Sequence, residues 1–215
     1  MPFPHFLWVM QEAERAALPG QEVPSVLPGA WLRYAPTFLD AASADGLLDA
    51  LLAEIRWEQH HVRLFGRTVP SPRLSCWIGD AGSAYTYSGV RQEPRPWPSS
   101  LRPMRDRLRA ACGTAFNSAL ANLYRDGGDA MGWHSDDEPE LGAEPLIASL
   151  SLGGTRRFLL RPRSGGGRLC LALAHGSLLL MGGDCQQLYR HALPRTRRDV
   201  APRINLTFRR IVHLG

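Results

Sequence analysis

The chain has 215 residues, a length that suits one large domain better than two full ones. With 44% hydrophobic and 21% charged residues, its composition excludes a wholly disordered, collagen-like or coiled-coil protein. All 25 basic residues are arginine, so the chain cannot carry a Schiff-base lysine, a pyridoxal-phosphate anchor or a Walker lysine. The net charge of +5, carried by guanidinium groups, makes nucleic acid a candidate partner.

The cysteines and the N-terminus bear on the cellular compartment. Four widely spaced cysteines with no Cys-x-x-Cys pair predict reduced thiols. The first ten residues lack the basic segment and apolar run of a signal peptide, and no stretch approaches the roughly 18 apolar residues of a membrane span. We therefore expect a cytoplasmic protein, in a bacterial cytosol, with no membrane partner.

The hydrophobic pattern changes along the chain. Residues 1–30 are proline-rich without a sustained period, which predicts an N-terminal extension. Apolar residues at helical spacing predict helices over 43–56, capped by Asp40 or Ser43, and from Ser99 or Ser100 to Gly113. From residue 116 onward, short apolar runs between turn residues predict strands and favour an antiparallel barrel or jelly roll, at 116–124, 146–152, 155–161, 168–174, 177–181, 187–192 and 203–211.

Polar residues alternate with apolar residues in the last strand. Because successive strand residues face opposite sides, one face carries Arg203, Asn205, Thr207 and Arg209. Taken alone, this pattern is typical of a strand with one face in water. Three other segments, however, carry metal- or anion-binding groups, and two of them space these groups two residues apart: Asn122 to Tyr124, His134 to Asp136, and the later His191.

A lone His-x-Asp triplet is typical of a surface turn. Two imidazoles and one carboxylate on an all-β scaffold are instead the ligand set of a facial triad, which leaves open positions on a ferrous ion. Those positions can accept a 2-oxo acid and dioxygen. Arg203 and Arg209 can then hold the carboxylate ends of a dicarboxylate co-substrate.

Several segments together carry a resemblance to a known family. They are Asn122-Leu-Tyr-Arg-Asp-Gly127, Trp133-His-Ser-Asp-Asp-Glu138, Ile147-Ala-Ser-Leu-Ser-Leu-Gly153 and Pro202-Arg-Ile-Asn-Leu-Thr-Phe-Arg209. In this order and spacing, they resemble the AlkB family of Fe(II)/2-oxoglutarate dioxygenases over residues 60–212. Within that family the chain is similar to the DNA-repair branch, in particular the second and third vertebrate paralogues.

The resemblance implies a mostly β fold with flanking helices, a double-stranded β-helix or jelly roll. Residues 31–115 would form an α/β nucleotide-recognition extension and residues 116–215 the catalytic core. The implied activity is oxidative demethylation of 1-methyladenine and 3-methylcytosine in DNA, with RNA as a further candidate, releasing formaldehyde, succinate and CO2. The implied cofactors are Fe(II), 2-oxoglutarate and O2, and we expect a monomer acting at the nucleoid.

The resemblance also assigns roles to individual residues. Fe(II) would be held by His134, Asp136 and His191. The distal carboxylate of 2-oxoglutarate would meet Arg203. The whole co-substrate site would comprise Asn122, Tyr124, Arg203, Asn205, Thr207 and Arg209.

Substrate recognition has its own candidates. The methylated bases are cationic, so Asp137 and Glu138 would favour the damaged form. On an extended chain Glu138 would project to the same side as His134, so it is the candidate for direct base contact. Asp137 could equally orient a neighbouring arginine. By resemblance, Tyr85 and Tyr87 belong to a substrate lid in which Tyr87 stacks on an extruded base.

Two clues to strandedness disagree. The run Phe65, Gly66 and Arg67 resembles the hairpin finger of the duplex-acting paralogue, where an apolar wedge fills the gap left by an extruded base. The segment 133–139 is instead closer to the paralogue that prefers single strands and also acts on RNA. Duplex and single-stranded nucleic acid therefore both remain candidate substrates. Two further alternatives for the function are an oxygenase that acts on a protein or small molecule, and a non-catalytic jelly-roll binding module.

Overall fold

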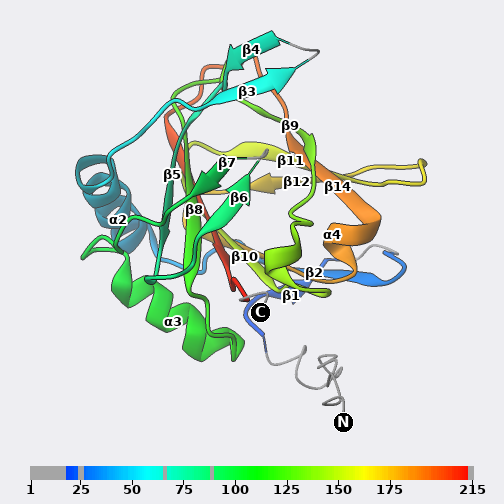
Figure 1. Ribbon diagram of the computed structural model, residues 1–215, viewed down its shortest axis with the longest axis horizontal. Helices are drawn as coiled ribbons and strands as arrows, with labels where there is room; N and C mark the ends of the chain where they lie inside the picture. The colour runs from blue at the N-terminus through cyan, green and yellow to red at the C-terminus, as the bar shows by residue number, and fades with distance from the viewer. Residues whose placement is uncertain (1–17, 24–26, 65–66, 88–89, 213–215) are drawn as a thin grey trace.

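The computed structural model describes residues 18–23, 27–64, 67–87 and 90–212. Its body is two antiparallel sheets that face one another (Figure 1). The larger sheet has the order β1 (Gln21–Glu22), β2 (Ala30–Ala35), β13 (Ser177–Gly183), β10 (Ile147–Gly153), β15 (Arg203–Arg209), β8 (Ser118–Tyr124) and β5 (Leu74–Gly79). The smaller sheet has the order β12 (Leu169–Leu173), β11 (Arg156–Pro162), β14 (Tyr189–Leu193) and β9 (Met131–His134).

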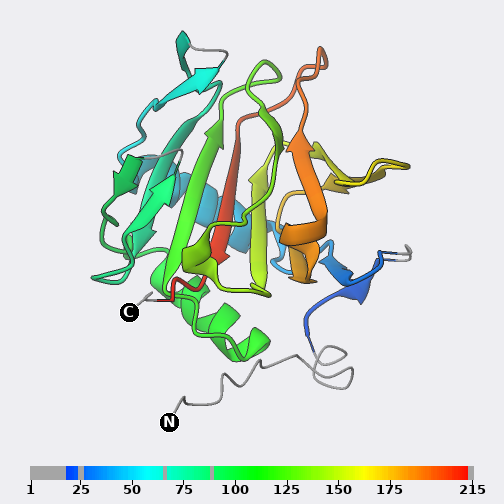
Figure 2. The ribbon, with the colours of Figure 1, turned by 45° about the vertical axis from the view of Figure 1, so that its right-hand side comes forward.

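Other elements surround the two sheets. Helices α2 (Ala41–Glu54) and α3 (Arg102–Cys112) pack on the outer face of the larger sheet (Figures 1 and 2). Two hairpins lie on the β5 side, β3 (His61–Leu64) with β4 (Arg67–Pro70), and β6 (Tyr85–Tyr87) with β7 (Val90–Gln92). The single-turn η1 (Pro139–Leu141) and α4 (Cys185–Leu188) complete the chain. Among the described residues, no helix is both long and apolar enough to span a bilayer.

The jelly roll that the sequence predicts is confirmed. Both predicted helices and all seven predicted strands are present, with ends shifted by a few residues. Strands β2, β5 and β9 have no equivalent in the sequence prediction. Buried on nearly every residue, β5 lacks the apolar and polar alternation of a half-exposed strand, and β9 has only four residues, one of them glycine. The larger sheet therefore draws strands from both sides of residue 116.

Local chemistry sets the helix ends. The side chain of Asp40 accepts a hydrogen bond from the Ser43 amide at 2.8 Å, so the predicted cap begins α2. Helix α3 has Pro103 in its first turn, where the missing amide hydrogen costs nothing. It ends at Gly113, whose φ of 62° lies in the left-handed region that glycine adopts without strain.

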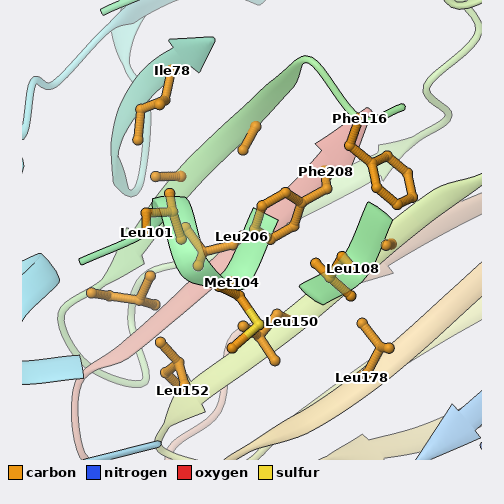
Figure 3. Packing of buried hydrophobic residues seen from close by; sticks show 14 of the residues in the cluster. Ile78, Leu101, Met104, Leu108, Phe116, Leu150, Leu152, Leu178, Leu206 and Phe208 are labelled. Carbon is orange, nitrogen blue, oxygen red and sulfur yellow. The ribbon is translucent and has the colours of Figure 1, made fainter. Parts of the chain in front are cut away.

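The interior strand β15 separates the apolar core from the polar space between the two sheets. Its apolar residues Leu206 and Phe208 are fully buried against α3 and neighbouring strands (Figure 3). The Phe208 ring stacks on Trp97, with centroids 6.1 Å apart, and meets the edge of Phe116. The alternate polar side chains therefore face the smaller sheet, buried between the two sheets rather than exposed to water.

The four cysteines are free thiols, as expected, but they differ in accessibility. Cys170 is exposed on the outer edge of the smaller sheet, and the other three are buried. Burial raises the pKa of Cys76 to about 11, and the pKa values of Cys112 and Cys185 to about 12. The buried thiols are therefore both inaccessible and protonated at neutral pH.

We expect a thiol reagent in neutral buffer to modify Cys170 alone in the native protein. A Cys170→Ser variant should then show no fast-reacting thiol, and all the remaining cysteines should react after denaturation. Mass spectrometry of the labelled protein measures this. Rapid labelling of any buried cysteine in the native variant would contradict the described packing.

The apolar face of β15 also predicts a stability difference. Leu206→Ala removes a fully buried side chain and should lower the free energy of unfolding by about 2–5 kcal/mol. Leu52→Ala, the same substitution at a side chain that is 39% exposed, should change it by no more than about 0.5 kcal/mol. Urea unfolding followed by circular dichroism compares the two, and equal losses would be inconsistent with the core.

Candidate active site

Two histidines and one aspartate converge between the sheets. His134 ends β9 and pairs in register with His191 of β14, which places their rings 4.2 Å apart. Asp136 follows two residues after His134. One potential ligand atom from each side chain lies within 4.8 Å of the others, so the three could hold a single metal ion. The sequence prediction of a convergent trio therefore matches the structure.

The hydrogen bonds of the imidazoles suit a metal. His134 Nδ1 lies 2.9 Å from the Gly132 carbonyl oxygen, which can only accept, so Nδ1 carries the proton and Nε2 keeps its lone pair. Nδ1 of His191 is buried without a hydrogen-bond partner among the described residues. The Phe158 ring packs against His191 at 5.4 Å, which limits how far that imidazole can turn. A buried ring nitrogen without a protein partner fits an imidazole that binds a metal ion.

Electrostatics keep both imidazoles neutral. Burial lowers the pKa of His134, and it lowers the pKa of His191 to about 3, with the neighbouring His134 adding to the effect. Neutral imidazole is the form that binds metals. Both side chains are therefore ready for coordination at neutral pH without first losing a proton.

Asp136 is ionised although it is buried. Burial by itself would raise its pKa, but the charge of Arg209 and the hydrogen bond from its guanidinium outweigh this effect, so the pKa of Asp136 is lowered. Arg209 Nη2 donates to Asp136 Oδ1 at 2.7 Å, and both side chains are at most 5% exposed. The Asp136 backbone N–H donates to the side-chain oxygen of Gln186 at 3.0 Å. This carboxylate is thus charged and held from two directions.

A cavity of about 50 Å³ adjoins the trio, and Arg203 lies in its wall. Arg203 is 1% exposed, and its Nη2 donates to Ser151 Oγ at 2.9 Å. Its Nε and Nη1 atoms are buried and have no hydrogen-bond partner among the described residues. Burial lowers the pKa of Arg203 to about 10, so the group stays charged at neutral pH. The side chain has no ion pair within the described part of the chain, so a bound carboxylate could supply the negative charge that its guanidinium needs.

The other residues proposed for the co-substrate also line this cavity. Asn205 Nδ2 donates to Ser149 Oγ at 2.8 Å, and Thr207 Oγ1 lies 3.3 Å from Asn205 Oδ1. The Tyr124 ring lies 5.3 Å from the Arg203 guanidinium. Arg209 lines the cavity too, and its Nη2 donates to Asp136 Oδ1.

Sequence reasoning missed several polar residues of the cavity. Arg73 is 5% exposed, and its Nε donates to Asn122 Oδ1 at 2.7 Å. Ser149 and Ser151 support Asn205 and Arg203, and their two-residue spacing in β10 was a signal that could have revealed them. Arg73 had no comparable local signal, because it stands just before a strand whose pattern was not recognised.

The structure describes only some of the residues that are expected to bind the base. Phe65 and Gly66 lie outside the described residues, whereas Arg67 belongs to β4, and Tyr85 and Tyr87 belong to β6.

The two acidic candidates lie beside the trio, and the cavity lining does not include either of them. Asp137 is exposed and forms an ion pair with Arg163, which fits the alternative in which it orients an arginine. Glu138 is half-buried and directly precedes η1.

Comparisons with known proteins agree with this geometry. A model of the 2OG-Fe(II) oxygenase superfamily matches residues 31–209. The chain is 41% identical over 186 residues to human "Alpha-ketoglutarate-dependent dioxygenase alkB homolog 3", covering 82% of this chain and 64% of that protein. It is 40% identical over 182 residues to mouse "DNA oxidative demethylase ALKBH2", covering 80% and 76% respectively.

A solved structure described as "The structure of OsALKBH1" shares the fold. The TM-score is 0.57 at 18% sequence identity, over 88% of this chain and 100% of that one. This chain spans less than two thirds of the human relative's length, so its similarity to that relative concerns the shared segment. The superfamily match includes the trio, because His134, Asp136 and His191 lie within residues 31–209. The chain belongs to the 2OG-Fe(II) oxygenase superfamily and, within it, to the AlkB family.

Proposed function

We propose that this chain is an Fe(II)- and 2-oxoglutarate-dependent dioxygenase that demethylates 1-methyladenine and 3-methylcytosine in DNA, releasing formaldehyde, succinate and CO2. One observation carries the proposal: two neutral imidazoles and an ionised carboxylate line the same cavity as the buried Arg203, which has no counter-ion among the described residues. Relatives named as an alkB homolog and as a DNA oxidative demethylase support the reaction class.

His134, Asp136 and His191 would hold the ferrous ion. When bound, the iron supplies the redox chemistry with O2, and three protein ligands leave positions open for the co-substrate and the gas. The chain supplies a charged carboxylate and two neutral imidazoles with their directions already set. It therefore needs neither proton release nor a large rearrangement to accept the ion.

The cavity wall would hold 2-oxoglutarate. Arg203 meets the distal carboxylate, which would neutralise a buried cation that has no ion pair among the described residues. Further polar contacts come from Asn122, Tyr124, Asn205, Thr207 and, on the side near the metal, Arg209. The co-substrate thereby lies between β15 and the trio, where the two sheets exclude bulk water.

The substrate residues rest on the family resemblance and on charge. Asp137 and Glu138 lie next to the trio in sequence, and their carboxylates favour a cationic methylated base over a neutral one. Glu138 contacts the base and Tyr87 stacks on it, with Tyr85, Phe65, Gly66 and Arg67 completing the surface. DNA, single- or double-stranded, is the main substrate and RNA a second one.

The remaining expectations concern organisation. Residues 31–115 would provide nucleotide recognition and residues 116–215 the catalytic core. The net charge of +5 suits a protein that approaches a phosphate backbone. We also propose that the chain acts as a monomer at the nucleoid of a bacterial cytosol.

Formaldehyde release tests the function. Purified chain, Fe(II) and 2-oxoglutarate should release formaldehyde from oligonucleotides carrying 1-methyladenine or 3-methylcytosine, and none from unmethylated oligonucleotides. Matched single strands, duplexes and RNA rank the substrates. Succinate formation without formaldehyde from any methylated oligonucleotide would redirect the activity to a protein or small molecule, and the absence of both would favour a binding module.

Removal of one metal ligand gives a second prediction. His134→Ala should reduce metal affinity and turnover by at least about 100-fold, because even residues outside the ligand set cost roughly 10–100-fold. The fold should persist, since no buried charge is left without a partner. The matched control is His60→Ala, at a histidine outside the cavity. Calorimetric Mn(II) titration and formaldehyde release measure the two effects, and wild-type affinity in the first variant would exclude His134 as a ligand.

A further inference from the structure

Asp136 hydrogen-bonds through its backbone N–H to a side chain rather than to a neighbouring strand. It follows the end of β9, and residues 135–138 belong to no strand. Its buried backbone N–H donates to Gln186 Oε1 at 3.0 Å. Gln186 is 1% exposed, so water does not compete for this acceptor. The side-chain oxygen of Gln186 thus accepts the hydrogen bond that a neighbouring strand would otherwise accept. This bond fixes the segment that carries His134 and Asp136, two of the three candidate ligands.

Gln186 is itself fixed by its surroundings. Its Nε2 lies 3.8 Å from the Met181 sulfur on β13, and its backbone carbonyl accepts from Arg163 Nη2 at 3.4 Å. It belongs to α4, which runs directly into β14 and therefore into His191. One side chain consequently ties the segment of His134 and Asp136 to the segment of the third ligand.

We propose that Gln186 is a positioning residue of the metal centre, which fixes the Asp136 backbone so that its carboxylate meets the two imidazoles. Arg209 orients the carboxylate from the larger sheet, and Gln186 orients the backbone from α4. Gln186 is not among the residues that line the cavity. Its amide is neutral, so it holds Asp136 without adding charge beside the carboxylate. This inference rests on the proposed function, because it assumes a metal at the trio.

The chain offers a matched pair of substitutions for the test. Gln186→Met keeps the length of the side chain and removes the acceptor. Gln187→Met makes the same change at the next residue, where the side chain is exposed and donates to the Ala143 carbonyl. Co(II), added without oxygen, is the probe, because its visible absorption reports both affinity and ligand geometry.

We expect Gln186→Met to bind Co(II) about 10–100-fold more weakly than wild type, with a changed visible spectrum, and Gln187→Met to match wild type. Thermal unfolding of the metal-free proteins separates this effect from a general loss of stability, which would leave the spectrum of the bound ion unchanged. Wild-type affinity and spectrum in Gln186→Met would overturn the inference alone. Failure of the wild-type chain to bind Co(II) would overturn the proposed function as well.

Hydrogen exchange on the wild-type protein tests the contact even if Gln186→Met does not fold. The Asp136 amide should exchange far more slowly than an unstructured amide, because its hydrogen is bonded to a buried acceptor. Exchange at the rate of an unprotected amide would show that Gln186 does not hold Asp136, and the inference would fail.

Discussion

The ion pair between Arg209 and Asp136 is the interaction on which the candidate centre depends. It joins β15, an interior strand of the larger sheet, to the segment that follows the edge strand of the smaller sheet, with both charges buried. A buried pair of this kind adds little net stability, because desolvation offsets most of the attraction. Its consequence here is chemical. Arg209 keeps the Asp136 carboxylate ionised in a place where burial alone would favour the neutral acid, and only the ionised form makes a strong metal ligand.

The two arginines of β15 are in different electrostatic situations. Arg209 has its counter-charge within the chain, whereas Arg203 has none among the described residues. The cavity lining therefore carries more positive than negative charge, because Arg73, a further buried guanidinium near His134, hydrogen-bonds to the neutral Asn122 and Ser71. A dicarboxylate suits this excess of positive charge, because one end can reach the metal and the other can neutralise Arg203. The charge distribution thus favours an extended diacid over a neutral or monoanionic ligand.

The alternation of β15 explains how one strand can support both the core and the chemistry. Leu206 and Phe208 pack under α3, and the alternate residues Asn205 and Thr207 face the cavity. A shift of one residue in the pairing of β15 would exchange the two faces, burying guanidinium groups in the apolar core. Pairing with β8 on one side and β10 on the other prevents such a shift. The packing that stabilises the jelly roll therefore also aims the polar side chains.

Much of the fold and of the site could be predicted from the sequence, because the signals are local. The two helices follow from apolar spacing and from their end residues Asp40 and Gly113, and the strands after residue 116 follow from short apolar runs between turns. The trio His134, Asp136 and His191 follows from residue type and order. The two faces of β15 follow from its period of two, although its polar face could have been taken for a solvent-exposed one.

Tertiary structure decided what is not local. The partner of Arg209 is 73 residues away in sequence, and Gln186 holds an amide 50 residues away. The pairing of Asp137 with Arg163 spans 26 residues, and no local pattern identified that arginine as its partner. Strand β5 joins the larger sheet although its residues show no alternation. Such contacts leave no periodic trace, because they depend on which strands become neighbours, and that is settled only when the whole sheet assembles.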